Sequence, residues 1–113
     1  MDIVVAARHG TLPEHVAELA RGQFERLGRF ESRVSRVEVT VTNEKNRWEV
    51  EAHASVDGDP PVHAHGEARD ARSAIDQAVE RMTRQVKRLR ERHRDHQAPA
   101  KEVEPATEPT EGP

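Results

Sequence analysis

Residues 34–68 read VSRVEVTVTNEKNRWEVEAHASVDGDPPVHAHGEA and contain three segments in which apolar and polar residues alternate. A period of two residues is typical of β-strands that bury one face. Two stretches rich in turn-forming residues, 43–46 and 57–61, separate these segments. We therefore predict three consecutive strands that share one apolar face of a sheet. The predicted strands span residues 34–42, 48–56 and 62–68.

The flanking segments complete the predicted fold. Residues 3–7 alternate in the same way and indicate a short first strand. A helix then follows, and the spacing of Thr11 and Glu14 predicts a capping box at its start. A second helix is predicted over residues 70–96, with Asp70 as its N-cap. The expected order is β-α-β-β-β-α, an α+β fold whose four-stranded sheet carries both helices on one face.

The core of such a domain must be thin and aliphatic, because only 34% of the residues are hydrophobic and only three are aromatic. Trp48 shares the apolar face of its strand, so we expect it to be substantially buried beneath a helix. The first helix is expected to end near Glu31 or Ser32. Its predicted buried residues are Val16, Leu19, Ala20, Gln23, Leu27 and Phe30.

Composition divides the chain of 113 residues into two parts. Residues 98–113 are rich in Pro, Glu, Ala and Thr, so we predict one folded domain over residues 1–97 and a disordered acidic tail over 98–113. The tail accounts for the formal net charge of −3, which leaves residues 1–97 neutral overall, with their cations concentrated in the second helix. The absence of cysteine, and an N-terminal apolar run too short for a signal peptide or membrane span, favour the cytoplasm.

The second helix carries a row of cations beside its apolar face. Arg81, Arg84 and Arg88 recur at three- and four-residue spacing and form a ridge, while Lys87 lies on the other side of the apolar stripe. Guanidinium groups bind phosphate in a bidentate manner, although such a ridge can also be a solvated surface without a ligand. Arg26 and Arg29 of the first helix would meet this ridge across an inter-helix groove if the two helices pack side by side.

This merged basic channel favours a nucleic-acid partner. The near absence of aromatic residues argues against reading single strands by base stacking, and favours recognition of the backbone and shape of structured RNA.

Catalytic motifs are missing from the sequence. It has no glycine-rich phosphate loop, no cysteine nucleophile and no serine in an activated setting, so we expect no enzyme activity, no cofactor and no small-molecule substrate. His53, His63 and His65 share the polar face of two strands. A suitable register would bring His53 next to His65, with Glu51 and Glu67 close by, which leaves a zinc or nickel site as an alternative. The expectation is a histidine-rich polar face without metal.

Several motifs follow one another in a characteristic order. They are Arg8-His9 after the first strand, Arg26-Leu27-x-Arg29-Phe30, Asn43-Glu44-Lys45-Asn46-Arg47, and Ala74-Ile75-Asp76-x-Ala78-Val79-Glu80-Arg81 continuing to Arg94-Asp95-His96. Together they resemble the ribosome hibernation promoting factor family, also called the ribosome-associated inhibitor or protein Y family, and the similarity extends over residues 1–97. The resemblance implies a fold similar to a double-stranded RNA-binding domain.

The resemblance also implies a function. Such a protein binds the decoding channel of the small ribosomal subunit, over the sites for messenger and transfer RNA, and stops translation in starved or stationary cells. Gln23 and Arg72 depart from the family's usual residues; the first would lose an RNA contact and the second could add one. The chain resembles the short family members, and we expect no membrane partner and a monomer off the ribosome. Some relatives are labelled modulators of an alternative sigma factor, which gives a second possible function. The residues expected to contact ribosomal RNA are Arg8, Arg26, Arg29, Arg81, Arg84, Lys87 and Arg88.

Overall fold

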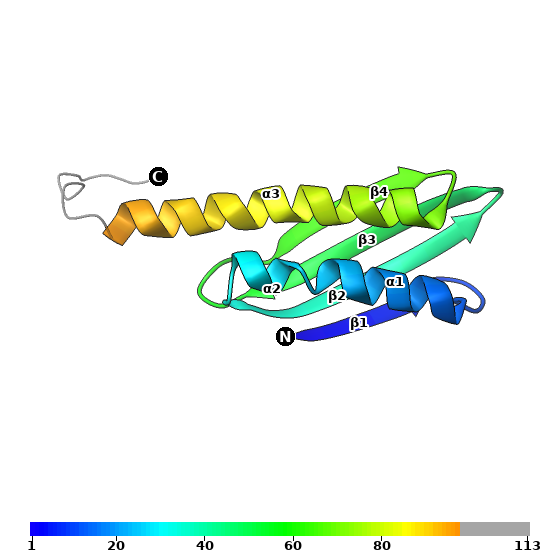
Figure 1. Ribbon diagram of the computed structural model, residues 1–113, viewed down its shortest axis with the longest axis horizontal. Helices are drawn as coiled ribbons and strands as arrows, with labels where there is room; N and C mark the ends of the chain where they lie inside the picture. The colour runs from blue at the N-terminus through cyan, green and yellow to red at the C-terminus, as the bar shows by residue number, and fades with distance from the viewer. Residues whose placement is uncertain (98–113) are drawn as a thin grey trace.

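The computed structural model describes the backbone of residues 1–97 and the side chains of residues 1–92, and the predicted tail lies outside the described residues. The elements are β1 (Asp2–Ala7), α1 (Glu14–Phe24), α2 (Leu27–Phe30), β2 (Val34–Glu44), β3 (Arg47–Val56), β4 (Val62–Ala68) and α3 (Ala71–Gln97). All helices lie on one face of the sheet (Figure 1), which confirms the predicted α+β fold and its order of elements. Among the described residues, no helix has the length and hydrophobicity needed to span a membrane.

The four strands lie in the order β1-β2-β3-β4. β1 runs parallel to β2, and the crossover between them is made by α1 and α2. The β2–β3 and β3–β4 pairs are antiparallel hairpins. Lys45 and Asn46 connect β2 to β3 with φ angles of 50° and 63°, the left-handed conformation that a two-residue hairpin turn requires.

The apolar faces meet in one core between sheet and helices. Phe24 is fully buried, although the sequence prediction omitted it, whereas Leu19, Gln23 and Phe30 are only partly buried. The sequence prediction also missed a break, since α1 ends at Phe24 and α2 begins at Leu27. The buried residues Val16, Ala20, Phe24 and Leu27 nevertheless keep three- and four-residue spacing across this break.

The two helix starts differ from each other. The predicted capping box is wrong, because α1 begins at Glu14 with Pro13 at the N-cap position and without a side-chain cap. The Pro13 carbonyl instead accepts hydrogen bonds from the amides of Val16 and Ala17. The Asp70 cap is confirmed, since its Oδ2 accepts a hydrogen bond of 2.9 Å from the Ser73 amide. This bond stabilises the carboxylate and lowers the pKa of Asp70 below its ordinary value.

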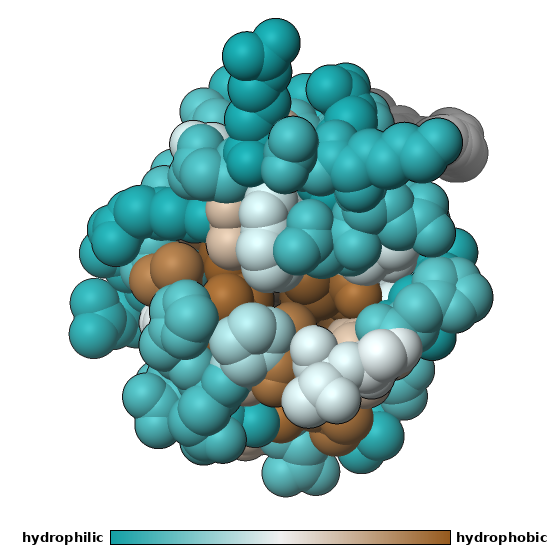
Figure 2. Space-filling view, turned by 90° about the vertical axis from the view of Figure 1, so that its right-hand side faces the viewer, coloured by the Kyte–Doolittle hydropathy of each residue, from teal (hydrophilic) through white to brown (hydrophobic). Residues whose placement is uncertain are grey.

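Trp48 is partly buried, so the prediction of substantial burial beneath a helix was only partly right. It pairs with Asn43 on one side and with Ala68, the last residue of β4, on the other. Trp48 therefore lies at the end of the sheet, where the helices begin. Figure 2 looks onto this end of the molecule and shows apolar residues at its centre, surrounded by hydrophilic residues.

α3 holds the outer edge of β4 through side chains one helical turn apart. Gln77 accepts a hydrogen bond of 3.0 Å from the Glu67 amide, and Arg81 donates one of 2.6 Å to the His65 carbonyl. Gln85 donates a third, of 2.6 Å, to the His63 carbonyl. Unpaired edge groups are a template for unwanted strand pairing, so these bonds protect β4.

An ion cluster joins the start of β2 to the β3–β4 turn. Arg33 pairs with Glu31 at 3.1 Å and with Asp59 at 2.8 Å, and also donates a hydrogen bond of 2.9 Å to the Asp57 carbonyl. Glu31 is only 8% exposed. The side-chain hydrogen bond from Arg33 holds the pKa of Glu31 below its ordinary value, despite the opposing effect of burial.

Stability should therefore fall in acid through Glu31. A carboxylate with a depressed folded-state pKa contributes stability that is complete above its unfolded pKa of about 4.3 and is lost as the pH falls through the folded value. We expect Glu31→Gln to be less stable than the parent at pH 7, with the difference shrinking below about pH 4. Urea unfolding from pH 7 to pH 3 measures this. A difference that stays constant with pH would show that the charge of Glu31 does not matter.

Candidate nucleic-acid interface

A groove of about 770 Å³ lies between the α1–α2 segment on one side and α3 on the other. The helices that form its two walls also contact each other, α1 with α3 and α2 with α3. Its lining combines positively charged, polar and a few apolar side chains. The lining residues are Gln23, Arg26, Arg29, Phe30, Arg72, Asp76, Val79, Glu80, Thr83, Arg84 and Lys87.

Five of these residues are cations, and only Asp76 and Glu80 are anions. Each anion takes up part of the charge of one neighbour. Glu80 lies 3.0 Å from Arg84, and Asp76 lies 3.7 Å from Arg72, both as pairs on successive turns of α3. Among the described residues, the other three groove cations form no ion pair. These three are Arg26, Arg29 and Lys87.

Two contacts shape the groove. Gln23 of α1 donates a hydrogen bond of 2.8 Å to Asp76 of α3, which ties one wall to the other. The Lys87 ammonium lies 4.8 Å from the centre of the Phe30 ring, within the range of a cation–π interaction. Phe30 thus holds a cation from the opposite wall over its ring. The groove therefore presents a net positive charge, which suits an anionic ligand.

The structure distributes the predicted RNA-binding residues over four places. Arg26, Arg29, Arg84 and Lys87 line the groove, so the two helices do bring cations together across it. The predicted ridge does not face the groove as a unit. Arg81 turns to the β4 edge, where it binds the His65 carbonyl, because it shares a side of α3 with the other β4-binding residues.

Arg88 is exposed but lies outside the groove lining, whereas Lys87, predicted on the opposite side of the stripe, lies inside it. Arg8 lies on the far face of the sheet, paired with Glu51 at 2.8 Å. Arg72, which was considered as an additional RNA contact but was not in the predicted set, also lines the groove. Its position one turn before Asp76 on the cationic helix was the available signal.

The outer face of the sheet is electrostatically different from the groove. Its three arginines, Arg8, Arg36 and Arg47, each lie within 2.9 Å of a glutamate. The partners are Glu51, Glu38 and Glu67. Exposed ion pairs of this kind contribute little stability, but each one neutralises the charge of its arginine. The three groove cations without an ion pair, Arg26, Arg29 and Lys87, lie instead on the helix side.

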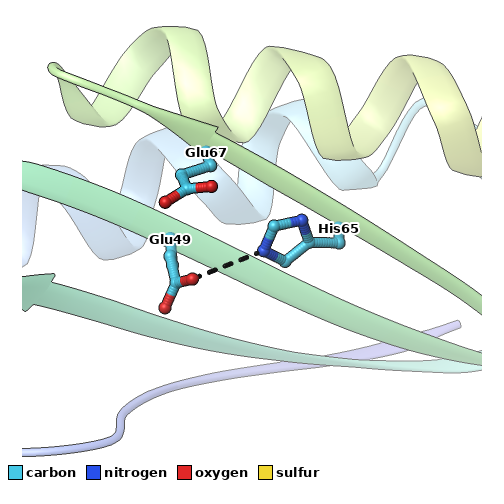
Figure 3. A group of neighbouring side chains, drawn as sticks. All are labelled: Glu49, His65 and Glu67. Atoms are coloured by element: carbon cyan, nitrogen blue, oxygen red, sulfur yellow. Dashed lines mark ion pairs between the residues drawn. The ribbon is translucent and has the colours of Figure 1, made fainter.

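The histidine pairing differs from the prediction. His53 faces His63 across the β3–β4 hairpin, with ring centres 4.5 Å apart, and does not pair with His65. The condition set for the alternative metal site is therefore not met, and His65 lies opposite Glu51. Its imidazole is directed toward Glu49 and Glu67 (Figure 3).

Two solved structures resemble this fold. The structure of a ribosomal subunit interface protein from Coxiella burnetii has a TM-score of 0.73 and 16% identity, and covers 80% of this chain and 99% of its own. The crystal structure of the Thermus thermophilus protein Y N-terminal domain has a TM-score of 0.70 and 24% identity, and covers 79% and 99% respectively. At these identities the likeness establishes the fold.

No curated protein sequence matches the chain. A family match is nevertheless found over most of its length, and it confirms the resemblance noted from the sequence motifs. Since residues 3–94 match the family described as sigma 54 modulation protein / S30EA ribosomal protein, the chain belongs to that family.

Proposed function

We propose that this protein binds the small ribosomal subunit through the groove between α1–α2 and α3, and that ribosomal RNA phosphates are its ligands. The observation that carries the proposal is the set of five cations converging from two walls, three of them without an ion-pair partner among the described residues. Guanidinium and ammonium groups in that arrangement suit a phosphate backbone. The names of the structural relatives and of the family, which refer to ribosomal proteins, support the same partner.

The groove favours backbone contacts over base reading. Phe30 is the only aromatic side chain in its lining, and Lys87 already lies over that ring. Proteins that read single strands instead stack bases on several exposed aromatic side chains. We therefore propose recognition of folded ribosomal RNA by its shape and charge.

Within the small subunit we propose the channel for messenger and transfer RNA as the binding place. Occupying it would block translation, so the protein would act as a cytoplasmic hibernation factor in starved or stressed cells. This is a binding function, without a catalytic step. The domain would be a monomer when off the ribosome.

Sedimentation of the full chain with purified ribosomal subunits tests this proposal. We expect the protein to sediment with the small subunit and not with the large one, and to be displaced by messenger RNA together with transfer RNA. Binding should weaken steeply as salt rises from 50 to 200 mM, because phosphate contacts release counterions. Binding to the alternative sigma factor, with no ribosomal association, would instead support the other function that the family description names.

A further inference from the structure

The outer face of the β3–β4 hairpin carries six potential metal ligands, arranged as three cross-strand pairs. The pairs are Glu49–Glu67, Glu51–His65 and His53–His63. This face lies on the side of the sheet away from the helices, so the ligands are separate from the cationic groove.

At one end of this array, Glu49, His65 and Glu67 bring their ligand atoms together. An imidazole nitrogen of His65 and one oxygen from each carboxylate all lie within 4.8 Å of one another. His65 Nε2 is 3.7 Å from Glu49 Oε2, and the imidazole points toward the carboxylates (Figure 3). Ligand bonds of about 2.0–2.2 Å place tetrahedral donors about 3.4 Å apart, so closing the cluster requires shifts of about 1 Å. The three side chains are 35–46% exposed and have room for such shifts.

A second observation concerns charge. Glu49 and Glu67 stand directly opposite each other, and like charges in that position destabilise a sheet unless a cation compensates them. Arg47 compensates one of them, since its Nε is 2.6 Å from Glu67 Oε2. Among the described residues, Glu49 forms no ion pair with a lysine or arginine, although the charge of Arg47 also acts on it at longer range. The cluster therefore has a net negative charge. One carboxylate oxygen of Glu49 and one of Glu67 lie close to an imidazole nitrogen of His65.

We propose that Glu49, His65 and Glu67 bind a divalent transition-metal ion of the zinc type, with water completing its coordination. One imidazole and two carboxylates suit zinc, whereas an ion that prefers oxygen alone, such as Mg²⁺, gains nothing from His65. The ion would compensate the negative charge of the two glutamates, which Arg47 compensates only in part. Since the His65 carbonyl also accepts the Arg81 hydrogen bond, the ion would fix β4 where α3 already holds it.

Isothermal titration of the full chain with zinc chloride, in a buffer without phosphate, tests the proposal. We expect one zinc ion per chain at this site. His65→Gln, Glu49→Gln and Glu67→Gln should each weaken zinc binding by more than about tenfold, since even outer residues of a zinc site contribute that much. Arg47→Ala should strengthen binding, because it removes the cation that competes for Glu67. Magnesium at the same concentration should not compete.

Two control variants separate this site from its neighbours. Glu38→Gln removes a carboxylate from the same sheet face, and His53→Gln with His63→Gln removes the adjacent histidine pair. Both controls should bind zinc as the parent does, and circular dichroism should show that every variant is folded. The proposal is overturned if the parent fails to bind zinc, if His65→Gln binds it at the parent level, or if the loss of His53 and His63 abolishes binding.

Discussion

Reversing one charge on each wall of the groove, with Arg29→Glu and Lys87→Glu, should abolish binding to the small ribosomal subunit. Charge-assisted hydrogen bonds contribute about 1.5–3 kcal/mol each, so losing two and adding repulsion should weaken binding by more than about a hundredfold. The dependence of log affinity on log salt should also become shallower by about two units, one for each phosphate contact removed. Both residues are exposed, so the fold should survive. Co-sedimentation across a salt series measures both effects.

The matched control is Arg36→Glu with Arg47→Glu, which changes the net charge equally but on the outer sheet face. This variant should bind within a few-fold of the parent. Equal losses in both double variants would mean that binding follows overall charge and not the groove. Parent-level binding of the groove variant would show that the RNA contacts lie elsewhere, for example along the exposed part of α3 that carries Arg88.

Gly66→Ala should destabilise the fold strongly. A Cβ at this position would overlap the Ala74 carbonyl oxygen and lie 2.8 Å from the Ala78 amide nitrogen, both backbone atoms of α3 that cannot move without moving the helix. Overpacking costs about 1–3 kcal/mol and sometimes more, and we expect about 3 kcal/mol here. For a domain of this size that corresponds to a fall in melting temperature of roughly 12–24 °C, measurable by calorimetry.

Gly22→Ala provides the opposite case. Gly22 lies inside α1, is exposed, and a Cβ there would meet no atom within 4 Å. Alanine should therefore stabilise the domain by roughly 0.5–1 kcal/mol, through helix propensity and a smaller loss of backbone entropy. If both variants shift the melting temperature in the same direction, the close contact of α3 with β4 is not what makes Gly66 necessary.

The strands were predictable from the sequence because alternation is a local signal. Val37, Val39 and Val41 show which face of β2 is buried, and the structure agrees. The register between two strands is harder to predict, because it depends on the length and type of the turn that connects them. The sequence of the 57–61 turn did not fix the register of β3 and β4, so the pairing of His53 with His65 stayed conditional and the Glu49–His65–Glu67 cluster was missed.

The candidate site was predictable only in part, for a similar reason. Helical spacing shows which residues share a side of α3, but it does not show what the neighbouring element is. Arg81 and Arg84 are one turn apart, yet Arg81 meets the edge of β4 whereas Arg84 meets the groove. The break between α1 and α2 was also invisible, because Glu25 and Arg26 fit a continuous helix. The RNA-binding roles of the groove residues stay predictions.

The parallel pairing of β1 with β2 has a consequence for how the chain folds. The two hairpins and the β4–α3 contact join segments that follow each other directly, so closing them costs little chain entropy. The pairing of Asp2 with Arg36, in contrast, joins two residues that are separated in the sequence by both α1 and α2. During synthesis β1 leaves the ribosome first, but it has no partner strand until β2 has been made. The rate of folding should therefore be set by the long-range closures, in which β1 pairs with β2 and the α1–α2 segment packs against α3 of a β2–β3–β4–α3 unit that neighbouring contacts can assemble.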